Sequence, residues 1–131
     1  MNETPDEYDR AVARNARRAV VERELVTHLL QNRVRWINVA DAAGICAGNF
    51  SQEDYRAIFA AIDAMRGRPL IDVLTGARML LRHVGAWDGA ATGINNGSLH
   101  SDMSLARMAV GFSCPAFIPT LCLELLEFGN A

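Results

Sequence analysis

The sequence has 131 residues, enough for one domain that buries about two-thirds of the surface its unfolded chain would expose. Half of the residues are hydrophobic and 21% are charged, a balance that excludes a disordered chain. The formal net charge is −2, so bulk charge does not indicate a nucleic-acid partner.

The first predicted helix begins at Pro5 and ends near Asn32. Thr4, Pro5 and Glu7 are typical of a helix start, with a capping hydroxyl, Pro at the first helical position and a carboxylate at the third. Apolar residues then recur at helical spacing. The pattern fits one long helix, or two with a break near Asn15.

This helix carries a stripe of basic residues, which are Arg10, Arg14, Arg17 and Arg18. Such a stripe can bind phosphates or a protein partner. Acidic residues lie at pairing distance along the same helix, and we expect a solvated face whose charges are paired internally.

A short helix follows over residues 34–44, and Gly44 closes it. Trp36 is its bulkiest residue. Trp is favoured at the centre of protein interfaces, so Trp36 is either an interface anchor or a partly buried residue at the edge of the core.

The stretch from Phe50 to Gly85 predicts two amphipathic helices joined by a short turn. Ser51 and Asp54 resemble a capping box at the first helix, and Asp72 is placed to cap the second. Large apolar residues recur at spacings of three and four on both helices. We expect this pair to form the structural core, with Phe50, Tyr55, Ile58, Phe59, Ile62, Ile71, Leu80 and Leu81 as its members.

Residues 86–101, from Ala86 to Ser101, are rich in Gly and Asn and predict a loop that is either functional or mobile. Ser101 or Asp102 then caps a helix, and the chain ends in a helix that is apolar on more than one face. Either the core or another chain must cover such a helix. We expect a homodimer through residues 103–110 and 121–128, with candidate interface residues Met103, Met108, Leu121, Leu125 and Phe128.

The sequence contains no pattern typical of catalysis. A GxxxxGK[ST] loop is absent, and the three histidines lack metal-ligand spacing. Ser98, His100, Ser101 and Asp102 lie close together, but triads usually converge from separate parts of a fold, so we interpret them as a polar loop with a helix cap. No catalytic residue, metal or cofactor is predicted.

The three cysteines show no CxxC spacing and are expected to be small buried residues in a reducing cytoplasm. The acidic N-terminus does not resemble a signal peptide, and no apolar run reaches the ~20 residues needed to span a bilayer. We therefore expect a soluble cytoplasmic protein without a membrane partner. No alternating pattern of strand residues is evident, so the predicted class is all-α, a compact bundle of about six helices.

Residues 17–89 resemble the N-terminal domain of DnaB-type replicative DNA helicases. The resemblance lies in the order and spacing of a Leu-Leu pair, a short helix, a Phe before a Tyr-Arg-x-Ile-Phe-x-Ala-Ile run, an Ile-Asp-x-x-Thr segment and a helix ending in Gly. The matching segments here are Leu29–Asn32, Trp36 with Val39–Ala40, Phe50, Tyr55–Ile62, Ile71–Thr75 and Gly85.

This resemblance implies a non-enzymatic docking domain of DNA replication, whose family counterpart contacts primase and supports the helicase ring. Primase, a helicase or a helicase loader would then be the partner. The family's ATPase domain has no counterpart here, and its later helical hairpin has no clear match after Gly89. The alternative is a helical regulator that binds a small ligand or nucleic acid through residues 86–101 and the arginine stripe, and an uncharted enzyme is a third hypothesis.

Overall fold

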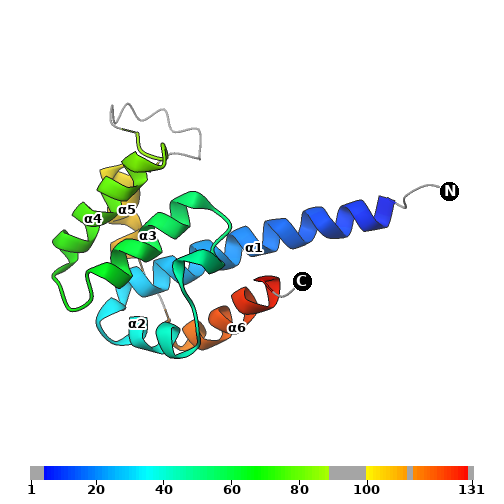
Figure 1. The fold of residues 1–131 in the computed structure, drawn as a ribbon, viewed down its shortest axis with the longest axis horizontal. Coiled ribbons are helices and arrows are strands. Elements are labelled where there is room, and N and C mark those ends of the chain that lie inside the picture. The colour runs from blue at the N-terminus through cyan, green and yellow to red at the C-terminus, as the bar shows by residue number, and fades with distance from the viewer. Residues whose placement is uncertain (1–4, 89–99, 112–113, 130–131) are drawn as a thin grey trace.

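The computed structural model describes residues 5–88, 100–111 and 114–129. Within these residues the chain forms six α-helices and two short 3-10 helices, and the β-type pairing seen there is one isolated bridge between Trp87 and His100. The predicted all-α bundle is confirmed (Figure 1). The helices are α1 (Pro5–Gln31), α2 (Arg33–Ala42), α3 (Glu53–Ala64), α4 (Leu70–His83), α5 (Asp102–Val110) and α6 (Ile118–Gly129), with η1 (Ala47–Asn49) after α2 and η2 (Pro115–Phe117) before α6.

Helix α1 is continuous through Asn15, so the chain has one long first helix and not two. Its second half lies in the body of the protein, whereas its first half projects away from it (Figure 1). Residues 6–17 are all exposed. We call residues 5–17 the arm.

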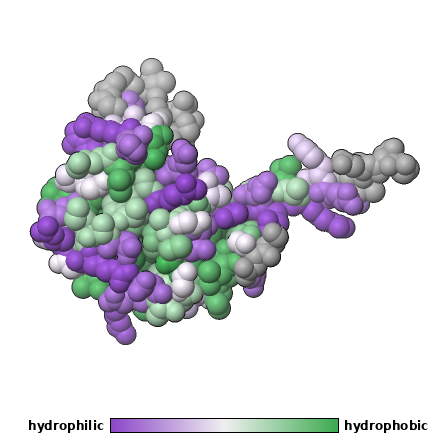
Figure 2. Space-filling view, in the orientation of Figure 1, coloured by the Kyte–Doolittle hydropathy of each residue, from purple (hydrophilic) through white to green (hydrophobic). Residues whose placement is uncertain are grey.

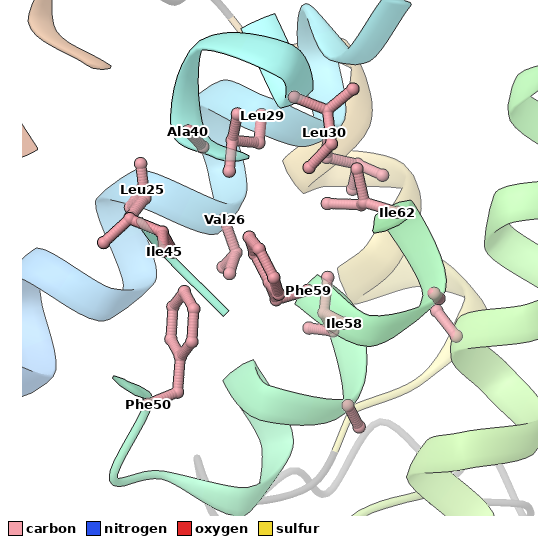
Figure 3. Close-up of a cluster of buried hydrophobic side chains, with 14 of the residues drawn as sticks. Leu25, Val26, Leu29, Leu30, Ala40, Ile45, Phe50, Ile58, Phe59 and Ile62 are labelled. Carbon is pink, nitrogen blue, oxygen red and sulfur yellow. The ribbon is translucent and has the colours of Figure 1, made fainter. Parts of the chain in front are cut away.

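The core lies between α1 and α3. Helix α4 packs against α3, helices α5 and α6 pack against α1, and α2 contacts α1, α3 and α6. Phe50 and Phe59 are buried at its centre, with their ring centroids 5.0 Å apart. Aliphatic residues of α1 and α3 surround the two rings (Figure 3). The core predictions for Phe50, Ile58, Phe59, Ile62 and Leu81 are confirmed, and Tyr55 is half-buried.

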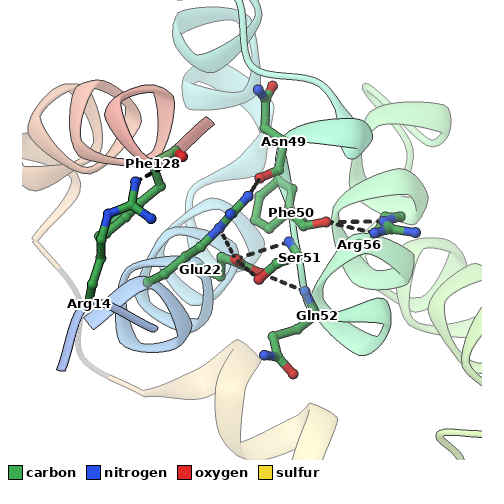
Figure 4. Close-up of polar contacts among 9 residues, drawn as sticks. Arg14, Glu22, Asn49, Phe50, Ser51, Gln52, Arg56 and Phe128 are labelled. Carbon is green, nitrogen blue, oxygen red and sulfur yellow. Dashed lines mark hydrogen bonds and ion pairs between the residues drawn. The ribbon is translucent and has the colours of Figure 1, made fainter. Parts of the chain in front are cut away.

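The start of α3 is held by a side chain from α1 and not by the predicted capping box. Its N-cap residue is Gln52, which makes no side-chain cap. Instead the buried carboxylate of Glu22 accepts hydrogen bonds from the backbone N–H groups of Ser51 and Gln52, at 3.0 and 2.9 Å (Figure 4). Glu22 therefore supplies from α1 the acceptor that an N-cap side chain usually supplies.

At the other helix ends, some of the predicted caps are present and others are not. Ser101 caps α5 by accepting a hydrogen bond from the N–H of Ser104, as predicted. Pro69 occupies the N-cap position of α4, so the predicted cap by Asp72 is wrong. Gly85 follows α4 with φ of 76°, a left-handed conformation that favours glycine. Thr4 lies outside the described residues.

Candidate protein-docking surface

Helix α4 is buried along one side only. Val73, Ala77 and Leu81 recur every four residues and pack against α3. Outside this stripe, Ile71 is 68% exposed, Met79 65% and Leu80 37%. The helix therefore presents three large hydrophobic side chains to solvent.

A groove of about 330 Å³ lies along one flank of α4, between this helix and α5. Its walls are mainly apolar, and the buried Leu105 lies at its floor. We call it the α4–α5 groove, and its lining residues are Ile71, Leu74, Thr75, Arg78, Asp102 and Leu105.

Two charges mark the α4–α5 groove. A guanidinium nitrogen of Arg78 lies 4.0 Å from a carboxylate oxygen of Asp102. The same guanidinium lies 5.7 Å from the centroid of the Trp87 ring, a cation–π arrangement. Both charged side chains are partly exposed, so the ion pair itself adds little stability and both groups can contact a partner.

A second groove, of about 220 Å³, lies on the other flank of α4. We call it the α3–α4 groove. Three alanines line it, Leu80 and Val84 contribute from α4, and Glu53 and Arg56 add one charge of each sign. Arg56 is fixed by hydrogen bonds from its guanidinium to the carbonyl of Phe50 (Figure 4). Helix α4 thus stands between two grooves.

The position of α5, and so the width of the α4–α5 groove, depends on polar contacts. The Gln31 side chain donates to the carbonyl of Met108 at 2.6 Å. Just before α5, His100 lies 2.8 Å from the carboxylate of Asp54 and edge-on to the Tyr55 ring. The backbone of His100 also pairs with Ala86 and Asp88, which brings the two ends of the 86–101 segment together.

These contacts bear on two predictions. His100 pairs with Asp54, which is distant in sequence, while Ser101 caps α5, so the polar residues near position 100 do not form a triad among those described. Residues 89–99, including Ser98, lie outside the described residues. Sequence reasoning missed the pairing of His100 with Asp54, because 46 residues separate them.

Two residues predicted as core are exposed, so the prediction was wrong for Ile71 and Leu80. The apolar arc of α4 is wider than the surface that α3 covers, and these two side chains lie at its edges. They line the two grooves instead. Both grooves therefore contain a large exposed apolar side chain.

The predicted interface residues fall into three groups. Leu121 and Leu125 are buried in the chain's own core, where α6 packs against α1 and α2, so they are not available to a second copy in this conformation. Met103 is 62% exposed and lies next to Asp102 of the α4–α5 groove. Trp36, Met108 and Phe128 are half-buried against the core.

The arginine stripe is largely engaged within the protein. Arg14 donates to the carbonyl of Phe128 and lies over its ring (Figure 4), and Arg17 binds Glu124 through two hydrogen bonds. Arg18 binds Glu22 and the carbonyl of Asn49. The expected internal pairing is therefore confirmed for Arg18, while Arg14 and Arg17 hold α6 against α1. Arg10 is exposed on the arm.

Outside the grooves, the pKa shifts of Glu124 and Cys122 come from an ion pair and from burial. The hydrogen bond from Arg17 lowers the pKa of Glu124, and burial raises the pKa of Cys122 from 9.0 to about 11. Cys122 is buried as predicted, but Cys46 is exposed. The described residues contain no group of three or more His, Cys, Asp or Glu side chains that could hold a metal ion.

Among the described residues, no single helix is long and apolar enough to cross a bilayer. One pair of segments, α5 and residues 115–129, reaches that length and composition together, and the two are bent by 94°.

Comparison of the chain with protein-family models, with curated proteins and with solved structures found no match.

Proposed function

We propose that this chain is a protein-docking module of DNA replication, and that α4 with its two flanking grooves receives a helix of the partner. The observation that carries the proposal is the exposure of Ile71, Met79 and Leu80 on one helix between two grooves. Exposed apolar residues scattered singly are normal, but a cluster beside concave surface marks an interaction site.

The grooves favour an amphipathic helix as the occupant. Their walls are mainly apolar, and each carries one basic and one acidic side chain: Arg78 with Asp102 in one groove, Arg56 with Glu53 in the other. A helix with an apolar face and charges of both signs at its edges matches this pattern, because apolar anchors supply affinity and rim charges set orientation.

The link to replication comes from the resemblance to the helicase N-terminal domain. In this chain several of the residues that carry the resemblance are buried: Leu29, Leu30, Phe50 and Phe59. The Ile71–Thr75 segment of the resemblance begins α4 and lines the α4–α5 groove. Primase, the replicative helicase or its loader is therefore the partner to test first.

The test is a binding titration with each of these three proteins, taken from the cell that encodes the chain. We expect one of them to bind, with an affinity that changes little between low and high salt, because apolar docking is weakly screened. Failure of all three to bind at concentrations near those in the cell would contradict the assignment to replication.

Binding of nucleic acid through the arginine stripe has less support. Three of its four arginines already bind groups of the protein itself. A phosphate-binding stripe would show an affinity for DNA or RNA that falls steeply with salt. Titration with a single-stranded and a double-stranded oligonucleotide at two salt concentrations measures that directly.

A further inference from the structure

The arm of α1 is a helix with little of its own chain against it. Tyr8 is 70% exposed and Val12 is 50% exposed. Figure 2 shows the arm standing clear of the body, with a hydrophobic spot on an otherwise mostly hydrophilic surface. Helices of this length are marginal in water unless an apolar face is packed. The arm therefore lacks the cover that stabilises the rest of α1.

The uncovered face of the arm continues a buried seam of the same helix. Spacings of four and three residues alternate along α1 from Tyr8 to Leu29, which is the heptad pattern of a coiled-coil seam. The inner half of the seam is fully buried in the body, and the outer half is not. The inner positions are Glu22, Val26 and Leu29, and the outer positions are Tyr8, Val12, Asn15 and Ala19.

Helix α6 does not cover the outer half of the seam. It reaches the arm through Arg14 and Arg17. At 3.6 residues per turn, these arginines lie on roughly the opposite face of α1 from Tyr8 and Val12. The seam is therefore exposed to solvent along the arm, whereas the opposite face of the helix contacts α6.

We infer that the arm pairs with the arm of a second copy of this chain, in antiparallel orientation. This surface differs from the predicted one on residues 103–110 and 121–128. Antiparallel pairing places Val12 opposite Asn15 of the second copy, and Tyr8 opposite its Ala19, two residues beyond the arm. Each layer then sets a larger side chain against a smaller one.

The charges of the arm select the antiparallel orientation. Its first turns carry Asp6, Glu7 and Asp9, whereas arginines dominate nearer the body. Antiparallel arms bring the acidic end of one helix beside the basic end of the other. Their helix dipoles then point in opposite directions, which is also favourable. Parallel arms would set like charges side by side. The overlap covers about two heptads, so the association is weak and depends on concentration.

Sedimentation of the full chain from low micromolar to near-millimolar concentration tests the pairing, with Val12→Glu as the variant. Ala13→Glu is the matched control, because it adds the same charge at the next exposed position, off the seam. Both positions lie outside the core, so the circular dichroism of the body should be unchanged. We expect reversible dimers for the native chain and Ala13→Glu, and dimerisation weakened at least about tenfold by Val12→Glu.

Orientation is tested by oxidative cross-linking in a Cys46→Ser, Cys114→Ser background, which keeps the buried Cys122. A mixture of the Tyr8→Cys and Ala19→Cys proteins should form mixed disulfide dimers faster than either protein alone. Three results would overturn the inference: a native chain that is monomeric at every concentration, a dimer that Val12→Glu leaves intact, or Tyr8→Cys dimers that form in preference to mixed ones.

Discussion

The carboxylate of Glu22 on α1 accepts the hydroxyl of Ser51 at 2.6 Å, across 29 residues of chain, and so ties α1 to the start of α3. The same carboxylate accepts two backbone N–H groups and the guanidinium of Arg18. The Glu22 side chain is fully buried, whereas its partners are partly exposed, so these hydrogen bonds lie at the edge of the core.

Replacing Glu22 with Ala should destabilise the protein by about 3–5 kcal/mol. The change removes the acceptor of the partly buried Arg18 guanidinium, of the Ser51 hydroxyl and of the N–H groups of Ser51 and Gln52, and each group left unsatisfied costs about 1–3 kcal/mol. Chemical denaturation measures the free energy of unfolding.

The matched control for this prediction is Glu124→Ala. Glu124 also binds an arginine of α1, at 2.7 Å, but that pair is substantially exposed. Exposed ion pairs contribute about 1 kcal/mol or less. Equal losses for the two variants would contradict the role assigned to the buried carboxylate of Glu22.

Truncation of Phe59 to Ala should cost about 3–5 kcal/mol, because its side chain is 2% exposed and its ring packs against that of Phe50. Ile71→Ala should cost under about 1 kcal/mol, since Ile71 is 68% exposed. Thermal and chemical unfolding of both variants provides the comparison. A stable Phe59→Ala protein would show that the α1–α3 core does not govern folding.

The helices could be predicted from the sequence because their apolar spacing and end signals are local. The buried faces of α3 and α4 follow spacings of three and four, and Gly85 ends α4 as expected. Signals of this kind are encoded within a few residues, so no tertiary information was needed to place most of the helices.

The contacts that define the candidate site are not local, and the sequence could not supply them. Glu22 caps α3 from another helix, and His100 finds Asp54 across 46 residues. The part of the apolar arc of α4 that stays exposed depends on how far α3 extends over it. Periodicity alone therefore could not show that Ile71 is exposed and Leu81 is buried. The open outer half of the α1 seam has the same origin, because α6 covers a different face.

Stability should fall at alkaline pH through Cys122. Its pKa is raised by burial to about 11, from an ordinary value of 9.0. The folded state thus favours the neutral thiol, and this contribution is complete below about pH 9 and lost as pH rises towards about 11. A pKa difference of two units between the folded and unfolded states corresponds to a loss of at most about 3 kcal/mol in the free energy of unfolding.

The measurement is the free energy of unfolding of the native chain and of Cys122→Ala across that pH range. Both proteins share their other titrating groups, so the difference between them isolates the thiol. We expect the native chain to lose more stability than the variant as pH rises. Parallel curves for the two proteins would contradict the assignment of a buried neutral thiol.

The central claim, that α4 is a protein-docking surface, is tested most directly by partner affinity for Ile71→Glu measured beside Val34→Glu. Both native residues are β-branched and nearly equally exposed, at 68% and 67%, but Val34 lies on α2, outside both grooves. We predict that Ile71→Glu weakens binding of the replication partner at least about tenfold while Val34→Glu changes it less than about twofold, with melting temperatures preserved in both. Equal affinities for the two variants would contradict docking on α4.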